Sequence, residues 1–384
     1  MTPHRAIALV FALHGAVAGS LATRIPWLQD HFELSPQMLG FVLLCQPIGA
    51  FIAMPTASRL SYRIGGRTAT RLLIAVWCAM LAAPALAPTP AVLFGFFVLY
   101  GMAAGTSDVV MNAHGVALER QLGRSIIAGL HGMWSVGSLV AGGVGVAAAH
   151  YAVDARIHLS IMAAILLGAA LAVGRGLHHD TASAQGPVPR RFALPTRAIV
   201  GIGLVGFCGT FAEGATANWA AVYMTKVTEA GPGTAAAAYT VFMLLTAGCR
   251  LVADRFVRRV GADTVVRLGG VLAIVGGVIV VFSRVPALSM VGFGFMGAGL
   301  AVVVPLVFLA ASRAGDTPAE GVAGVATITY LSGLIAPAVT GWAAGTFSYP
   351  LAFALITLVV VGMTVFAGVL RPKGDERENV TAAT

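Results

Sequence analysis

The sequence predicts an all-α membrane protein with twelve transmembrane helices in two pseudo-symmetric six-helix bundles. The first observation is composition: of 384 residues, 58% are hydrophobic and only 10% are charged, and the mean hydropathy is +0.87. A soluble domain carries roughly 25% charged residues because water must solvate its surface. The second and third observations are the recurrence of long apolar runs and the gathering of Arg in alternate gaps between them. We therefore expect lipid, not water, to surround this chain.

The apolar runs give the individual elements. A membrane-spanning helix needs about 20 apolar residues. The predicted spans are residues 5–26, 37–57, 69–88, 91–117, 126–149, 157–175, 198–222, 237–253, 267–283, 287–311, 321–345 and 350–370. The first run also resembles a cleavable signal peptide, but the many apolar segments that follow favour a retained first helix.

The distribution of Lys and Arg gives the orientation. If both termini are cytoplasmic, 20 of the 24 Lys and Arg residues fall on the cytoplasmic side, Arg250 among them. This asymmetry is what the positive-inside rule predicts for an even number of spans. The division into domains follows: residues 1–175 and 198–370 form the two bundles, residues 176–197 a cytoplasmic linker, and residues 371–384 a cytoplasmic tail.

Several function classes find no support in the sequence. The net charge is +9, but the basic residues lie in short runs between apolar segments, where they determine the membrane topology. We therefore expect no nucleic-acid partner. The four cysteines show no paired spacing, and His178-His179-Asp180 favours a solvated linker over a metal site. No phosphate-binding loop and no nucleophile–base spacing stands out. We expect no enzyme activity, no cofactor and no metal, and a monomer whose partners are a small solute and the bilayer.

The two halves of the chain repeat each other. Arg63-Ile64-Gly65 recurs as Arg259-Val260-Gly261 at an offset of 196 residues. Phe97 and Gly101 match Phe293 and Gly297 at the same offset. Duplicated halves often build a transport site at the repeat interface near the middle of the membrane.

The loops between the second and third spans of each half carry a resemblance to a known family. The segment from Ser58 to Arg67 contains Arg63, Gly65 and Arg67, and resembles the Gly-x-Leu-x-Asp-Arg-x-Gly-Arg loop of the major facilitator superfamily, with Ser58 and Tyr62 replacing the Gly and the Asp. The second copy keeps the acid, with Asp254, Arg255 and Gly261. Stretches such as 107–113 and 213–219 are similar to sugar-permease-like bacterial members. The resemblance implies the fold of that family over the whole chain and a gating role for the two loops.

Ionisable residues within the predicted spans are the candidate functional groups, because a charge at the membrane centre costs about 2.5–3.5 kcal/mol on insertion scales. Asp108 begins a polar stripe that continues with Asn112, Gly115 and Glu119 at helical spacing. Asp108 either carries a proton or makes a structural bond, for example to Arg124. Glu213 lies between Gly209 and Gly214, and the resemblance implies that its helix lines the central cavity, so we predict proton coupling over a structural clamp.

Histidines and aromatic residues complete the candidate set. His131 either relays protons or bonds to a neighbouring helix. Arg24 either binds an anionic group of the solute or extends to the outer membrane interface. The remaining candidates for contact with a solute are His14, Asn112, Trp134, Asn218 and Trp219.

The expected function is secondary active transport of a small polar solute, such as a sugar-like compound, across a bacterial cytoplasmic membrane by proton-coupled alternating access. Two alternatives stay open. One is a proton-driven exporter of amphipathic compounds, and the other is a membrane sensor that has kept the fold and lost transport, which the altered loop at Tyr62 favours.

Overall fold

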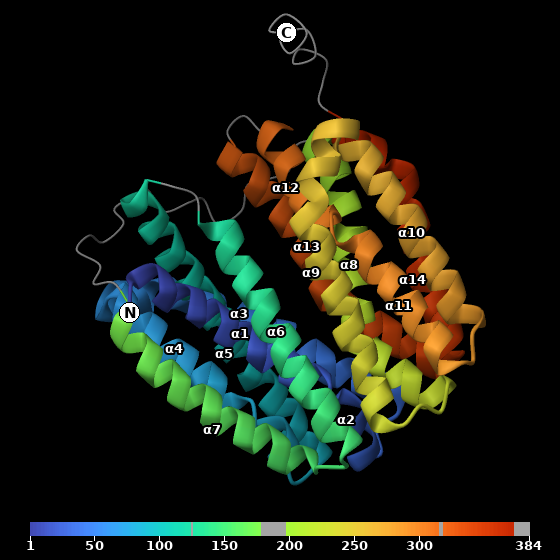
Figure 1. The fold of residues 1–384 in the computed structure, drawn as a ribbon, viewed down its shortest axis with the longest axis horizontal. Coiled ribbons are helices and arrows are strands. Elements are labelled where there is room, and N and C mark those ends of the chain that lie inside the picture. Colours follow the sequence, from blue (N-terminus) through green and yellow to red (C-terminus); the bar gives the residue numbers. More distant parts are fainter. Residues whose placement is uncertain (124–125, 178–196, 315–317, 372–384) are drawn as a thin grey trace, which may run out of the picture. The chain divides into compact units, whose positions relative to one another are not determined.

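The computed structural model describes residues 1–123, 126–177, 197–314 and 318–371, which are helical throughout apart from short connections (Figure 1). Twelve helical segments in these ranges are long and apolar enough to cross a membrane, which confirms the predicted number. The helices are α1 Pro3–Ala22, α2 Ile25–His31, α3 Pro36–Ile64, α4 Gly66–Met80, α5 Pro90–Leu122, α6 Ile127–His150, α7 Ala155–Val173, α8 Arg197–Val227, α9 Pro232–Val260, α10 Ala262–Phe282, α11 Pro286–Leu300, α12 Val303–Ala314, α13 Pro318–Thr346 and α14 Tyr349–Phe366. The predicted linker, with His178 and His179, and most of the tail lie outside the described residues.

Three helices begin at a local signal of the same kind. Thr2, Ser35 and Thr89 each precede a proline at the first helical position, and each side chain accepts a hydrogen bond from a backbone N–H of the first turn. Such a cap satisfies one of the N–H groups that a helix start leaves without a partner, and proline has no N–H to leave unpaired. Sequence therefore fixes the starts of α1, α3 and α5.

The predicted repeat is present in the backbone. Gly65 joins α3 to α4 with φ 82° and ψ 145°, and Gly261 joins α9 to α10 with φ 84° and ψ 158°. A positive φ of this kind suits glycine, which has no Cβ to clash. Two positions 196 residues apart thus make the same one-residue connection between long helices.

The contacts beside these connections repeat as well, with changed chemistry. In the first half Arg67 donates from Nη2 to the carbonyl of Arg175 at 2.6 Å. At the equivalent positions of the second half, Arg371 donates from Nε to Asp263 at 2.5 Å. Both contacts join the start of the third span of a half to the end of its sixth span.

The helices form two compact units. The first comprises Met1–Pro187, Ala217–Met243 and Pro337–Tyr349, and the second comprises Val188–Thr216, Leu244–Ala336 and Pro350–Thr384. The first unit therefore includes the last turns of α8, the beginning of α9 and the end of α13, besides the first seven helices.

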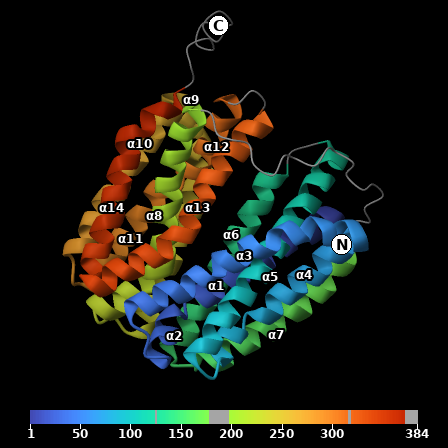
Figure 2. The ribbon, with the colours of Figure 1, turned by 180° about the vertical axis from the view of Figure 1, so that it is seen from behind.

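Close helix contacts hold each unit together. In the first unit α1 packs along α6, α3 along α5, and α4 lies beside α7 (Figures 1 and 2). A Cβ at Gly137 would lie 1.9 Å from the carbonyl oxygen of Ala12, so α1 and α6 meet backbone to backbone. In the second unit α10 packs along α11, and a Cβ at Gly299 would lie 2.2 Å from the carbonyl oxygen of Gly269. Small residues at helix crossings are typical of membrane proteins, where van der Waals contact drives association.

Candidate functional site

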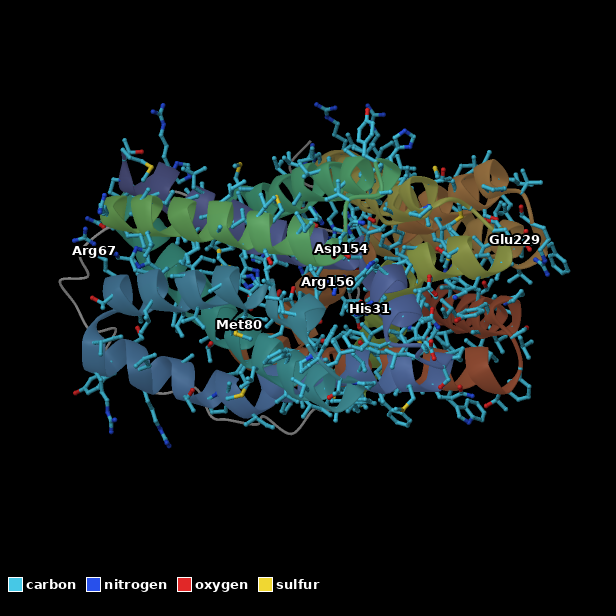
Figure 3. All side chains as sticks on the ribbon, turned by 90° about the horizontal axis from the view of Figure 1, so that it is seen from below. His31, Arg67, Met80, Asp154, Arg156 and Glu229 are labelled. Atoms are coloured by element: carbon cyan, nitrogen blue, oxygen red, sulfur yellow. The ribbon has the colours of Figure 1, made fainter. Side chains whose placement is uncertain are left out.

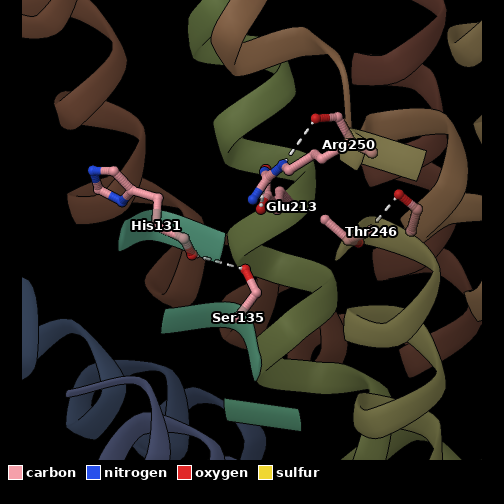
Figure 4. Close-up of polar contacts among 7 residues, drawn as sticks. His131, Ser135, Glu213, Thr246 and Arg250 are labelled. Carbon is pink, nitrogen blue, oxygen red and sulfur yellow. Dashed lines mark hydrogen bonds and ion pairs between the residues drawn. The ribbon is translucent and has the colours of Figure 1, made fainter. Parts of the chain in front are cut away.

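An ion pair inside the spans of the second unit is the main charged feature there. Glu213 on α8 and Arg250 on α9 meet with Arg250 Nη2 at 2.8 Å and 3.0 Å from the two carboxylate oxygens (Figure 4). The side chains are 20% and 32% exposed, respectively. A charge within a membrane span is costly unless it is paired or faces an aqueous path. Glu213, predicted from sequence, thus has a partner that the sequence interpretation counted among the cytoplasmic arginines, at the end of the predicted span 237–253.

Arg250 also contacts a break in the tenth span. The span expected at 287–311 is two helices, because α11 ends at Leu300 and α12 begins at Val303. Pro305 has no N–H, so the carbonyl of Ala301 has no donor four residues later. Arg250 Nε donates to this carbonyl at 2.9 Å. One guanidinium therefore binds the carboxylate of α8 and the backbone acceptor at the break.

A neighbouring residue on α9 makes a similar contact. Thr246, one turn before Arg250, donates its hydroxyl hydrogen to the carbonyl of Gly297 at 3.1 Å (Figure 4). The carbonyls of Gly297 and Ala301 are consecutive acceptors along one face of the broken span. Helix α9 thus supports this face through two side chains.

In the first unit the candidates His14 and Trp134 lie together. Trp134 donates its indole N–H to His14 Nδ1 at 3.0 Å, and His14 Nε2 lies 3.4 Å from the carbonyl of Ala104. The ring of Trp77 stacks on His14 with centroids 5.1 Å apart. An imidazole that accepts at Nδ1 must carry its proton at Nε2 when it is neutral. These contacts fit a neutral His14, since a second ring proton would point at the Trp134 N–H.

The predicted stripe on α5 divides into two parts. Asn112 donates to the Asp108 carboxylate at 3.1 Å and to the Asp108 carbonyl at 2.9 Å, and both side chains are half-buried. Asp108 and His131 are the ionisable groups that interact electrostatically with His14. Asp108 and Asn112, at the beginning of the stripe, therefore lie close to the group formed by His14 and Trp134. Arg124, the alternative partner of Asp108, lies outside the described residues.

Glu119, the last residue of the stripe, has a structural role. Glu119 accepts from the backbone N–H groups of Ile126 and Ile127 at 2.7 Å and 3.0 Å. These residues stand at the start of α6, where N–H groups have no helical acceptor. A carboxylate there also interacts favourably with the helix dipole. Glu119 thus caps α6.

His131 and its neighbour Ser135 lie at the beginning of α6. The His131 side chain is exposed, and its ring makes an edge contact with Phe11 at 5.3 Å between centroids. Ser135 donates to the His131 carbonyl at 3.3 Å (Figure 4). These contacts are compatible with either interpretation of His131.

Arg24 is buried within the first unit. Its side chain is 4% exposed, with Nε 3.1 Å from His158 Nδ1 and Nη2 3.2 Å from the carbonyl of Val153. Burial lowers the pKa of Arg24 from its usual value, and the guanidinium remains charged because its ordinary pKa lies far above neutral pH. Arg24 lies between α1 and α2, where the first predicted span, 5–26, is interrupted after Ala22.

The helix α2 that follows carries a second group of polar contacts in the first unit. Lys226 on α8 donates to Asp30 at 2.5 Å, and Gln29 donates to the hydroxyl of Tyr349 at 2.9 Å. On α6 and α9, Ser138 and Tyr239 hydroxyls lie 2.9 Å apart. Figure 3 shows His31, Asp154 and Arg156 near one another and Arg67 far from them. These contacts attach α8, α9 and the start of α14 to helices of the first seven.

The last two candidates on α8 differ in environment. Trp219 is completely buried, and its ring centroid lies 6.2 Å from that of Tyr349. Asn218 is half-buried. Trp219 thus packs at the α2 end of the first unit, and Glu213 belongs to the second unit.

The loop residues keep their predicted places. Arg63 is exposed near the end of α3, two residues before Gly65. Arg255 is exposed on α9, six residues before Gly261. The side chain of Asp254 lies outside the described part of the chain. The gating role that the family resemblance gives to these residues stays a prediction.

Arg250 is the residue that sequence reasoning missed. It falls at the end of the predicted span 237–253, but the sequence analysis counts it with the cytoplasmic arginines that follow Asp254 and does not consider it as a functional residue. It lies nevertheless within the span Pro232–Ala253, three residues before its end. An arginine inside an apolar window was a signal that could have identified it.

The comparisons with known proteins agree with this architecture. A family model described as the Major Facilitator Superfamily matches residues 7–330. An uncharacterized transporter of Sinorhizobium fredii is 31% identical over 97% of this chain and 99% of its own length. An uncharacterized MFS-type transporter of Yersinia pestis is 32% identical over 94% of this chain and 93% of its own length. The membrane protein MosC of Rhizobium meliloti is 28% identical over 94% of this chain and 88% of its own length.

Solved structures share the fold at low sequence identity. The nucleoside transporter NupG has a TM-score of 0.78 at 14% identity, covering 97% of this chain and all of that chain. A D-xylose–proton symporter has a TM-score of 0.74 at 14% identity, covering 97% of this chain and 99% of that chain. The fold, the twelve spans and the relatives together define a multi-pass membrane transporter for a small-molecule solute. The chain belongs to the major facilitator superfamily.

Proposed function

We propose that this transporter moves a small polar solute, such as a sugar-like compound, across the bacterial cytoplasmic membrane by proton-coupled alternating access. The bundles 1–175 and 198–370 are the two moving parts, and both termini are cytoplasmic. The relatives are bacterial, and the proteins that share the fold include a nucleoside transporter and a D-xylose–proton symporter, both named for hydroxyl-bearing solutes. Because Arg250 lies within a span, it no longer counts toward the cytoplasmic side. The cytoplasmic excess of Lys and Arg remains without it.

The Glu213–Arg250 pair is the observation that carries the proposal of proton coupling. A carboxylate and a guanidinium in contact within spans stabilise each other's charge, whereas breaking such a pair leaves one charge unpaired and costs about 3–5 kcal/mol when it is buried. Protonation of Glu213 removes the charge that holds Arg250 Nη2. The pair is therefore a two-state element that proton binding can switch.

Alternating access is supported by the contacts of α2. With cytoplasmic termini, α2 lies on the outer side of the membrane, because it follows the first span. The Asp30–Lys226 and Gln29–Tyr349 contacts then hold the outer ends of second-half helices against the first half. Gly40 and Gly341 also meet there, since a Cβ on Gly341 would lie 2.8 Å from the Cα of Gly40. We propose that these contacts close the outer side of the solute path and separate when it opens.

The proposal is tested by proton-driven uptake in vesicles as a function of pH. Glu213→Gln and Asp108→Asn keep side-chain shape and remove the titrating group, and Glu229→Gln, on an exposed loop residue, is the matched control. We expect Glu213→Gln to abolish the dependence of uptake on a proton gradient, with a smaller effect for Asp108→Asn and none for the control. Undiminished proton-dependent uptake in both candidate variants would refute the coupling assignment.

A further inference from the structure

The guanidinium of Arg250 uses only part of its hydrogen-bonding capacity. A guanidinium has five N–H donors in one plane. Nε is bound to the Ala301 carbonyl, and Nη2 lies within hydrogen-bonding distance of both oxygens of Glu213. Nη1 has no partner among the described residues, and it is not among their buried unpartnered atoms. Its two N–H groups are therefore open to a ligand.

The arrangement also fixes the orientation of this open edge. Because Nε and Nη2 are both held, the plane of the guanidinium has little freedom to rotate. A donor pair that is oriented before binding loses less conformational entropy when a ligand arrives. Nη1 is thus a preorganised donor, and its ligand must supply lone pairs.

Charge decides which kind of acceptor fits. Ionised Glu213 cancels the charge of Arg250, so the pair is neutral as a whole. An anion at Nη1 would stand close to the carboxylate of Glu213, and like charges at this distance in a medium of low dielectric constant repel strongly. The charged group of a cationic solute, such as an ammonium group, has no lone pair to accept a hydrogen bond from Nη1. An uncharged oxygen, from a hydroxyl or a carbonyl group, meets neither obstacle.

The same face of α8 offers further groups of matching chemistry. Thr210 stands one turn before Glu213, and its hydroxyl lies 2.6 Å from that of Ser332. Phe207, one turn earlier, is half-buried and stacks with Phe211 at 6.1 Å between centroids. A half-buried hydroxyl and an aromatic ring along one face of α8 suit a solute with both hydroxyl groups and apolar C–H surface.

The geometry points to Arg250 as a specificity-determining residue that binds an uncharged, hydroxyl- or carbonyl-bearing solute through Nη1, while Glu213 cancels its charge. This inference rests on the proposed function, since it names the solute class of that transporter. It also assigns Glu213 a second role, because removing its charge leaves Arg250 as an uncompensated cation. Glu213→Gln should then change selectivity in favour of anions.

Binding to purified protein in detergent tests the inference without transport. The probes are a panel of uncharged sugars and nucleosides, with lactate and benzoate as carboxylates, and the readout is the ligand-induced shift in melting temperature. For the wild type we expect a shift with at least one uncharged probe and none with the carboxylates. For Glu213→Gln we expect carboxylate affinity to rise at least about tenfold, a change of about 1.4 kcal/mol. Glu229→Gln should behave like the wild type.

A double variant separates binding from folding. Glu213→Gln/Arg250→Met removes both charges, so it leaves no unpaired charge within the spans. It should lose the carboxylate affinity gained by Glu213→Gln and also the response to the uncharged probe. Carboxylate binding by the wild type, no response to any uncharged probe, or no gain in Glu213→Gln would each overturn the inference. Undiminished proton-dependent uptake in both Glu213→Gln and Asp108→Asn, with this selectivity intact, would instead refute only the proposed function.

Discussion

Arg250 donates its Nε hydrogen to the carbonyl of Ala301 at 2.9 Å, and this carbonyl is the one that Pro305 leaves without a helical donor. The break in the tenth span is thus completed by a side chain from α9. The same side chain is the counter-ion of Glu213 on α8. Three helices therefore meet at one guanidinium, and a change in the charge of Glu213 acts directly on the group that satisfies the broken helix.

A double-mutant cycle measures this relationship. Arg250→Lys keeps the charge that Glu213 needs and removes the planar Nε donor, while Pro305→Ala restores an N–H four residues after Ala301. Alone, Arg250→Lys leaves the carbonyl unsatisfied, at a cost of about 1–3 kcal/mol. In the Pro305→Ala background the carbonyl has its own donor, so we expect the cost of Arg250→Lys to fall by about 1 kcal/mol. The measurement is the unfolding free energy in detergent.

Additive effects of the two substitutions would contradict the relationship. Pro305→Ala by itself is expected to stabilise the protein, because proline in a helix costs up to about 3 kcal/mol relative to alanine. Pro47→Ala, a proline inside α3, is the matched control. It should show no coupling to Arg250→Lys.

Hydropathy predicted the number of spans because the need for about 20 apolar residues is nearly independent of tertiary context. The repeat was also visible, since Gly65 and Gly261 are required by the same positive φ. The ion pair could not be predicted in full. Glu213 stood out as an acid in an apolar run, but which residue meets it depends on helix packing, and Arg250 lay next to a loop whose arginines share its composition.

The first span shows a different limit of sequence reasoning. Residues 5–26 were expected to form one helix, yet α1 ends at Ala22 and α2 begins at Ile25. Pro26 contributes locally, because it has no N–H for the carbonyl of Ala22. Arg24 adds hydrogen bonds to His158 and to the carbonyl of Val153, more than 120 residues away. Local patterns hold no information on such partners.

The contacts of His14 bear on its predicted role as a contact for the solute. Its two ring nitrogens contact the Trp134 N–H and the Ala104 carbonyl, and its own carbonyl accepts from Trp77 at 3.2 Å. Its side chain is 7% exposed. These contacts favour a structural role at the crossing of α1, α4, α5 and α6 over direct contact with the solute.

Trp134→Phe tests this role, because it keeps the aromatic packing and removes the donor to His14 Nδ1. A buried acceptor without a partner destabilises the folded state by about 1–3 kcal/mol, and we expect a loss of this size in the unfolding free energy. Trp342→Phe is the matched control, since Trp342 is 52% exposed. It should change stability by less than about 0.5 kcal/mol. Equal effects of the two substitutions would show that the hydrogen bond to His14 contributes nothing.

The contact between α2 and α8 yields a test of outer closure. Asp30 and Lys226 are 51% and 36% exposed, so their ion pair contributes only about 0.2–1 kcal/mol. Even this energy changes a balance between two conformations by up to about fivefold, which is enough to slow a transport cycle measurably. Asp30→Lys and Lys226→Asp each place like charges together, and we expect either one to lower the initial rate of uptake several-fold.

Exchange of the two charges separates the ion pair from other effects of substitution. Asp30→Lys/Lys226→Asp restores an opposite pair at the same site, so uptake should recover most of the lost rate. The defect of the single variants should also shrink as salt is raised, because exposed charges are screened over about 8 Å at physiological ionic strength. If the double variant is as slow as the slower single variant, the Asp30–Lys226 contact does not govern closure of the outer side, and the role must pass to the backbone contact of Gly40 with Gly341.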